Sequence, residues 1–129
     1  MIELSWYNTL VKPSFTPPAW IFAPAWTIIY IMIFISLILF IFKKTELDKK
    51  RGYILFFSQL VLNILWSPVF FGLHNIVVAM VIIVLLDILV LFNIKEFLKV
   101  SRASGLLLIP YFLWLIFATY LNGGFCILN

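Results

Sequence analysis

The sequence has few of the residues that carry the chemistry of soluble enzymes. It contains one cysteine and one histidine in 129 residues, so neither an internal disulfide nor a cysteine or histidine metal cluster is expected. Its five glycines are scattered and form no phosphate-binding loop. No serine stands in an evident arrangement with a histidine and an acid. We therefore expect no catalytic residue, no metal and no resident cofactor.

Charged residues are also scarce, at 11% of the chain, whereas soluble domains average about 25%. Hydrophobic residues make up 65% and aromatic residues 19%. A soluble fold of this length could not bury so much apolar surface, so the predicted solvent is a bilayer. Four apolar runs, at 19–42, 53–73, 76–94 and 105–129, match the roughly 20 residues that cross a bilayer, and only Asp87 interrupts the third.

None of these runs alternates apolar and polar residues with a period of two, which excludes a closed membrane barrel. We predict an all-α integral membrane helical bundle with four transmembrane helices. Residues 1–129 form a single membrane domain, with an N-terminal loop at 1–16 and helices at about 17–42, 52–73, 75–97 and 104–127.

The basic residues gather in two of the connections, 43–51 and 95–102, whereas the opposite side of the bundle has only Lys12 and His74. Positive loops stay on the cytoplasmic side, so both connections are expected there, in a bacterial inner membrane. Basic loops beside apolar spans indicate topology and contact with anionic headgroups, so we expect no nucleic-acid partner.

Helical spacing places large or polar side chains on one face of three helices. Two structures explain these faces equally well. One is a packed core with two hydrogen-bonded amides, and the other is an aromatic-walled cavity for a large flat apolar ligand. The three sets are Phe22, Trp26 and Tyr30 on the first helix; Gln59, Asn63, Trp66 and Phe70 on the second; and Trp114, Phe117, Ala118 and Leu121 on the fourth.

The stretch 6–30 contains four of the six prolines and three of the five tryptophans. Proline fixes φ, so this stretch is expected to be stiff. Thr16 followed by Pro17 predicts the start of the first helix, since a hydroxyl N-cap often precedes a proline at N1. The stretch fits either a membrane-anchoring loop with interfacial tryptophans or a lid of fixed shape over a cavity.

Asp87 is expected near the middle of the membrane, where an acidic side chain is unfavourable and is commonly functional. Ser36 and Gln59 lie at a similar depth and are its predicted partners. Asp87 either pins the helices as a hydrogen-bonded acid or serves as the exchange site of a small proton-coupled multidrug exporter, which is our alternative function.

Three stretches resemble the translocator-protein family, also called the tryptophan-rich sensory proteins (TspO/MBR) or peripheral-type benzodiazepine receptors. They are WYNTLVKPSFTPPAWIFAPAW, LNILWSPVFFGLH and PYFLWLIFATYLN. The resemblance implies a membrane bundle that binds porphyrins, heme or related tetrapyrroles, sterols in some members, and synthetic drug-like molecules. It places the ligand beneath the N-terminal loop, in contact with Tyr7, Trp26, Asn63, Trp66, Phe70, Trp114, Phe117, Ala118 and Leu121.

The same resemblance implies a light-dependent breakdown of porphyrin in which Trp26 and Trp114 take part, although we expect a binding protein rather than an enzyme. The family has five spans, so this chain is expected to lack the first one. The family's sterol pattern needs a Lys or Arg after Tyr120, but LNGGFCILN follows it here. This departure weakens the expectation that sterols bind. A homodimer is left open, because no small-residue GxxxG stripe is present to indicate one.

Overall fold

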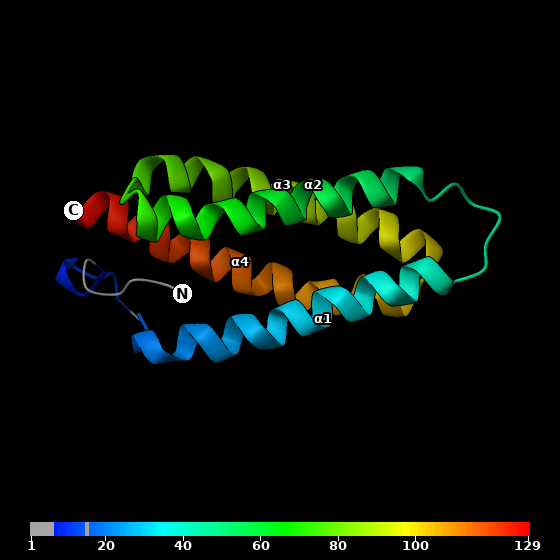
Figure 1. Cartoon of the computed structure of the whole chain (residues 1–129), viewed down its shortest axis with the longest axis horizontal. Helices are drawn as coiled ribbons and strands as arrows, with labels where there is room; N and C mark the ends of the chain where they lie inside the picture. The colour runs from blue at the N-terminus through cyan, green and yellow to red at the C-terminus, as the bar shows by residue number, and fades with distance from the viewer. Residues whose placement is uncertain (1–6, 15) are drawn as a thin grey trace.

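The computed structural model describes residues 7–14 and 16–129, so residues 1–6 and Phe15 of the predicted N-terminal loop lie outside the described residues. Four long helices run antiparallel along the molecule (Figure 1): α1 (Phe22–Phe42), α2 (Lys50–Ser67), α3 (Ile76–Val100) and α4 (Arg102–Leu128). The described residues contain no strand. With the turn that extends α2, all four helices are long and apolar enough to cross a membrane, which confirms the predicted all-α membrane bundle.

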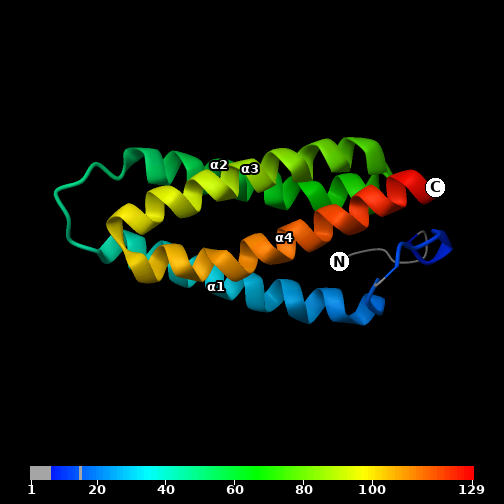
Figure 2. The same ribbon diagram turned by 180° about the vertical axis from the view of Figure 1, so that it is seen from behind.

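The helices pack in the order α1, α4, α3, α2. Figure 2 shows α4 lying between α3 and α1. α4 meets α3 closely at Gly105, where a Cβ would lie 2.5 Å from the Leu98 side chain and 2.9 Å from its backbone nitrogen. Each tight turn has its own cap, because Asn75 accepts from the Val78 amide and Ser101 from the Ser104 amide.

The first helix starts later than predicted, since α1 begins at Phe22 rather than at residue 17. Thr16 does not cap it: the Thr16 hydroxyl donates to the Pro13 carbonyl at 2.6 Å. The chain then passes through the short helix η2 (Ala19–Ile21). Pro24 consequently falls in the first turn of α1, where its missing N–H is not needed.

The second helix also departs from the prediction at both ends. It begins at Lys50, and its last turn is a π-helix, η3 (Pro68–Gly72). Pro68 has no N–H to continue the α-helical ladder, and the Leu73 amide bonds the Pro68 carbonyl at 2.9 Å instead.

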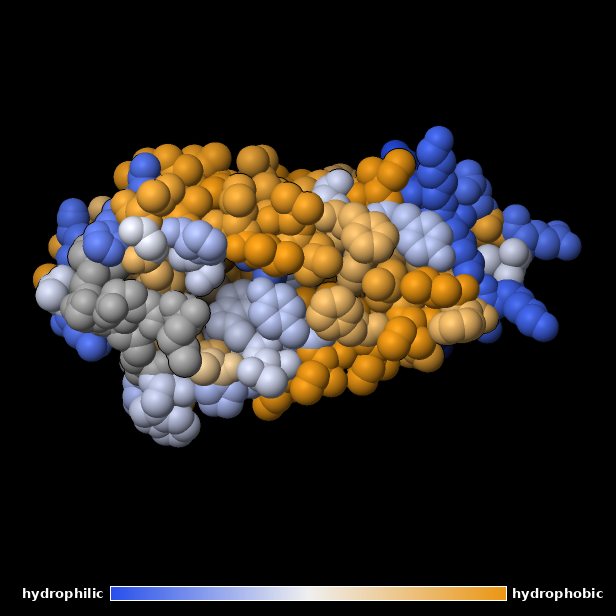
Figure 3. Space-filling view, viewed as in Figure 1, coloured by the Kyte–Doolittle hydropathy of each residue, from blue (hydrophilic) through white to orange (hydrophobic). Residues whose placement is uncertain are grey.

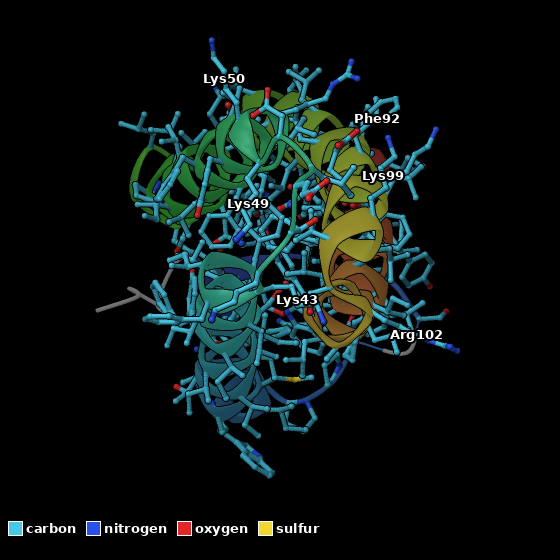
Figure 4. All side chains as sticks on the ribbon, turned by 90° about the vertical axis from the view of Figure 1, so that its right-hand side faces the viewer. Lys43, Lys49, Lys50, Phe92, Lys99 and Arg102 are labelled. Atoms are coloured by element: carbon cyan, nitrogen blue, oxygen red, sulfur yellow. The ribbon has the colours of Figure 1, made fainter. Side chains whose placement is uncertain are left out.

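The two basic connections lie at the same end of the bundle. Figure 4, which views this end, shows Lys43, Lys49, Lys50, Lys99 and Arg102 together. The Lys49 ammonium donates to three carbonyls at the end of α1, at 2.7 to 3.0 Å, and so caps that helix. Figure 3 shows apolar surface along the length of the bundle and hydrophilic surface at this end.

Candidate functional site

The aromatic faces of α1, α2 and α4 converge on one cavity at the end of the bundle opposite the basic loops. The cavity measures about 140 Å³, and Tyr7 of the short helix η1 (Tyr7–Thr9) lines it from the N-terminal loop. Nine of its thirteen lining side chains are aromatic. The lining residues are Tyr7, Phe22, Ala23, Trp26, Trp66, Phe70, Phe71, Trp114, Phe117, Ala118, Leu121, Asn122 and Phe125.

Eight of the nine residues predicted to contact ligand line this cavity: Tyr7, Trp26, Trp66, Phe70, Trp114, Phe117, Ala118 and Leu121. The ninth, Asn63, is not among the lining residues. Their contact with a ligand stays a prediction, but the structure brings eight of them to one place from three helices and the N-terminal loop.

Trp26 lies at the centre of the aromatic wall. Its ring centroid is 6.0 Å from that of Trp114, with the rings perpendicular, and 6.4 Å from that of Trp66, with the rings tilted by 36°. Trp66 in turn stacks on Phe70 at 5.2 Å. The cavity therefore presents both ring faces and ring edges, the geometries that aromatic ligands prefer.

Asn122 fixes the orientation of Trp66. The indole N–H of Trp66 donates to the Asn122 carbonyl oxygen at 3.0 Å, and the Asn122 amide donates to the Ile76 carbonyl at 3.1 Å. The indole N–H of Trp114, by contrast, is buried without a hydrogen-bond partner among the described residues. Within the described part of the chain, the wall thus holds one indole N–H with a partner, that of Trp66, and one without, that of Trp114.

Asn63 belongs to a polar network one turn deeper on the face of α2 that also carries Trp66. The Tyr30 hydroxyl donates to the Asn63 carbonyl oxygen, and the Asn63 amide donates to the Tyr111 hydroxyl at 2.9 Å. Tyr111 donates onward to Gln59 at 2.6 Å. The network joins α1, α2 and α4, so the predicted hydrogen-bonded amides and the predicted aromatic cavity are both present, at different depths.

The π-helix η3 brings two aromatic residues to the cavity. Phe70 and Phe71 are both buried, and their ring centroids are 4.8 Å apart. Both line the cavity, as the consecutive residues Phe117 and Ala118 of α4 also do.

The N-terminal loop is fastened to the end of α4. The Val11 backbone exchanges two hydrogen bonds with the Asn129 side chain, at 3.0 and 2.9 Å. The Tyr120 hydroxyl donates to the Ser14 carbonyl at 2.7 Å. Pro13 fits against Gly124, where a Cβ would lie 2.5 Å away from it. The loop is therefore packed over the cavity.

Tyr7 is the buried centre of this loop, with 1% of its surface exposed. Its ring contacts Phe22, Phe71 and Phe125, with centroids 5.5 to 6.0 Å away. Its hydroxyl has no partner among the described residues. Burial of this hydroxyl disfavours the charged phenolate and raises the pKa of Tyr7 from 10.0 to about 12.

Asp87 lies apart from the cavity, and its predicted partners were wrong. Its carboxylate accepts from the Thr119 hydroxyl at 2.6 Å. Ser36 instead bonds Ser104, and Gln59 bonds Tyr111. The predicted depth was wrong, because Ser36, Gln59 and Asp87 meet α4 at Ser104, Tyr111 and Thr119, and positions seven or eight residues apart on a helix are separated by about 10–12 Å. Among the described residues, no side chain of α3 lines the cavity.

Five lining residues had not been predicted as ligand contacts: Phe22, Ala23, Phe71, Asn122 and Phe125. Helical spacing could have added Asn122 and Phe125, which lie four residues after Ala118 and Leu121 on the same face of α4. Phe71 lies five residues after Trp66, so the three- and four-residue spacing that defines this face does not indicate it.

Together, the fold and the site define a small helical membrane protein with an aromatic-walled cavity at one end of its bundle. The sequence profile of the TspO/MBR family matches residues 2–128. The chain therefore belongs to the TspO/MBR family and is an integral membrane protein.

Individual relatives agree with this assignment. The chain is 45% identical over 122 residues to the tryptophan-rich protein TspO of Chlorobaculum tepidum, covering 92% of this chain and 76% of the relative. It is 44% identical over 126 residues to the protein of the same name from Archaeoglobus fulgidus, covering 97% and 80%. It is 33% identical over 122 residues to the human translocator protein, covering 92% and 72%.

Proposed function

We propose that this protein binds porphyrins, other tetrapyrroles or similar flat hydrophobic molecules in the aromatic cavity and senses or transports them in the membrane. The observation that carries the proposal is that nine of the thirteen lining side chains are aromatic and come from three helices and the loop. Such walls favour flat ligands with few polar groups. The names of two relatives, a tryptophan-rich sensory protein from Cereibacter sphaeroides and the human translocator protein, agree with sensing or translocation.

The size of the cavity bears on how a tetrapyrrole would fit. An apolar cavity of about 150 Å³ holds one benzene ring, and this one measures about 140 Å³. A tetrapyrrole has four pyrrole rings, so it needs a wider space. Binding of a macrocycle therefore requires a wall or the loop to move.

The position of the basic loops suggests the orientation of the site. If these loops are cytoplasmic, as the distribution of Lys and Arg favours, the cavity opens in the outer half of the membrane. In a bacterial inner membrane this half faces the periplasm, and a sensor there would respond to ligand outside the cytoplasm.

The alternative function, a proton-coupled multidrug exporter, receives less support. Such an exporter needs its exchangeable carboxylate beside the substrate pathway. Asp87 bonds Thr119 on the side of α4 that faces α3, and it is not a lining residue. The tetrapyrrole proposal uses the aromatic lining directly and does not depend on Asp87.

The test measures how three Trp-to-Phe substitutions change the affinity for protoporphyrin IX. Binding is monitored by the quenching of the remaining tryptophan fluorescence. Trp26→Phe and Trp114→Phe change the cavity wall, and each is expected to weaken affinity about three- to tenfold, the size of one aromatic contact. Trp20→Phe is the matched control, because Trp20 is 72% exposed and is not a lining residue. Equal affinities in all three variants would reject the cavity as the binding site.

A further inference from the structure

Lysine and arginine are concentrated at one end of the bundle, and a single lysine lies at the other. Eight of the nine Lys and Arg residues belong to the segments 43–51 and 95–102, and the ninth is Lys12 of the N-terminal loop. The tendency of positive loops to stay on one side of a membrane accounts for the eight but not for Lys12. The charge at the cavity end of the bundle therefore needs an explanation of its own.

The backbone on both sides of Lys12 is held in place. Val11 exchanges two hydrogen bonds with the Asn129 side chain, at 3.0 and 2.9 Å. Pro13 is buried, and it lies so close to Gly124 that a Cβ there would be 2.5 Å away. Lys12 itself is exposed. Its side chain therefore extends into water from a fixed position on the loop.

The Lys12 ammonium lies beside the cavity. It is 5.0 Å from the centroid of the Tyr7 ring, over the ring face, and a cation at this distance is attracted by the aromatic electrons. Tyr7 in turn lines the cavity. The positive charge and the cavity thus share one aromatic side chain.

The charge of Lys12 is not neutralised within the part of the chain that the structure describes. No ion pair there involves Lys12. The acidic side chains of that part lie elsewhere: Glu46, Asp48 and Glu96 at the basic end, and Asp87 in the middle of α3. An anion bound at the cavity would therefore meet an available ammonium group.

The cavity itself has no charged side chain. Its lining consists of nine aromatic side chains, three aliphatic ones and the amide of Asn122. A carboxylate enclosed by such a lining would lose its hydration without gaining a cation, which is strongly unfavourable. An acidic group on a flat ligand must therefore project from the cavity to a partner outside it, and Lys12 is placed to be that partner.

We propose that Lys12 binds a carboxylate of the ligand while the flat ring lies in the cavity, so that the protein prefers flat aromatic acids to their uncharged esters. This inference rests on the proposed function and gives Lys12 a role in specificity. The flexible stem of lysine lets the ammonium leave the Tyr7 ring and follow the carboxylate. Because the pair lies at the surface, water and salt weaken it, and its contribution to affinity is modest.

The test compares protoporphyrin IX with its dimethyl ester, which has the same ring but no carboxylate. Affinities are measured by tryptophan quenching of the full chain in micelles of an uncharged detergent. Lys12→Met removes the charge and keeps an unbranched side chain that packs well on an aromatic ring, whereas Lys12→Arg keeps the charge. Lys44→Met is the matched control, because Lys44 is also exposed but lies at the basic end.

We expect Lys12→Met to bind protoporphyrin IX about three- to fivefold more weakly than wild type, the upper range for one exposed ion pair, and to bind the ester with wild-type affinity. Lys12→Arg and Lys44→Met should keep the wild-type affinity for both probes.

Three results would overturn the role of Lys12 and leave the proposed function standing. They are equal weakening of acid and ester binding in Lys12→Met, which would show that Lys12 acts through the packing of the loop; unchanged acid binding in Lys12→Met; and the same loss of acid binding in Lys44→Met. Absence of quenching by either probe in the wild-type protein would overturn the proposed function as well.

Discussion

The buried hydroxyl of Tyr7 predicts that a substitution which removes it will stabilise the closed form of the N-terminal loop. An unpartnered buried hydroxyl costs about 1–3 kcal/mol, and this one has no partner among the described residues. Tyr7→Phe keeps the ring contacts and removes the hydroxyl, so it should stabilise the closed loop by about 1 kcal/mol. Most substitutions in a packed site are expected to do the opposite.

Hydrogen exchange of the Val11 amide, which donates to the Asn129 side chain at 3.0 Å, measures this effect, because its rate follows the population of the open loop. We expect this amide to exchange about fivefold more slowly in Tyr7→Phe than in wild type, the equivalent of about 1 kcal/mol. Tyr120→Phe is the matched control: it loses a hydroxyl that donates to the Ser14 carbonyl at 2.7 Å, so its Val11 amide should exchange faster. Faster exchange in Tyr7→Phe than in wild type would refute the argument.

The same hydroxyl is expected to weaken the closed form of the loop at alkaline pH. Burial raises the pKa of Tyr7 from 10.0 to about 12. The neutral form is favoured in the closed loop, so closure does not depend on pH through this group below pH 10 and is weakened as the pH rises from 10 to 12. Tyrosinate absorbance that differs between wild type and Tyr7→Phe should therefore titrate near pH 12. A difference that titrates near pH 10 would contradict the burial of Tyr7.

Three further substitutions test other parts of the bundle. Gly52→Ala places a Cβ 2.5 Å from the buried Phe40 ring and should destabilise the protein by about 1–3 kcal/mol. Gly72→Ala is the control and should not destabilise it, because no described atom lies within 4 Å of that Cβ position. Equal thermal stabilities of the two variants would contradict this packing. Tyr111→Phe leaves the Asn63 and Gln59 amides short of one hydrogen bond each. It should lower the free energy of unfolding in detergent micelles by about 1–3 kcal/mol, the cost of leaving a buried polar group unpaired. Unchanged stability would show that the network contributes little. Asp87→Asn should leave the affinity for protoporphyrin IX unchanged in the quenching assay, and a loss would return the carboxylate to the ligand pathway.

The fold could be predicted from the sequence because a bilayer imposes a simple rule, one apolar run for each spanning helix. The converging faces were also predictable, since the spacing of Trp114, Phe117, Ala118 and Leu121 fixes which way they point relative to one another. Spacing gives direction around a helix but not depth in the cavity. Asn63 accordingly shares a face with Trp66 yet lies a turn too deep to line the cavity.

Three features could not be predicted from spacing along the sequence. Thr16 matches an N-cap pattern, but its hydroxyl bonds the Pro13 carbonyl, because the chain turns before α1 begins. No periodicity indicates the π-helix at Pro68–Gly72. The partner of Asp87 depends on how far α3 is shifted along α4, which places Thr119 in reach, whereas Gln59 meets α4 at Tyr111.

The affinity of an Ala118→Phe variant for protoporphyrin IX tests the central claim most directly. Ala118 is 7% exposed and lines the cavity, so a phenyl ring at this position would occupy the space of about 140 Å³ between the three helices. Leu113→Phe, on the lipid-facing side of α4 with Leu113 62% exposed, is the matched control. The cavity account predicts that Ala118→Phe loses most of its binding while Leu113→Phe keeps the wild-type affinity. Wild-type affinity in Ala118→Phe would contradict it.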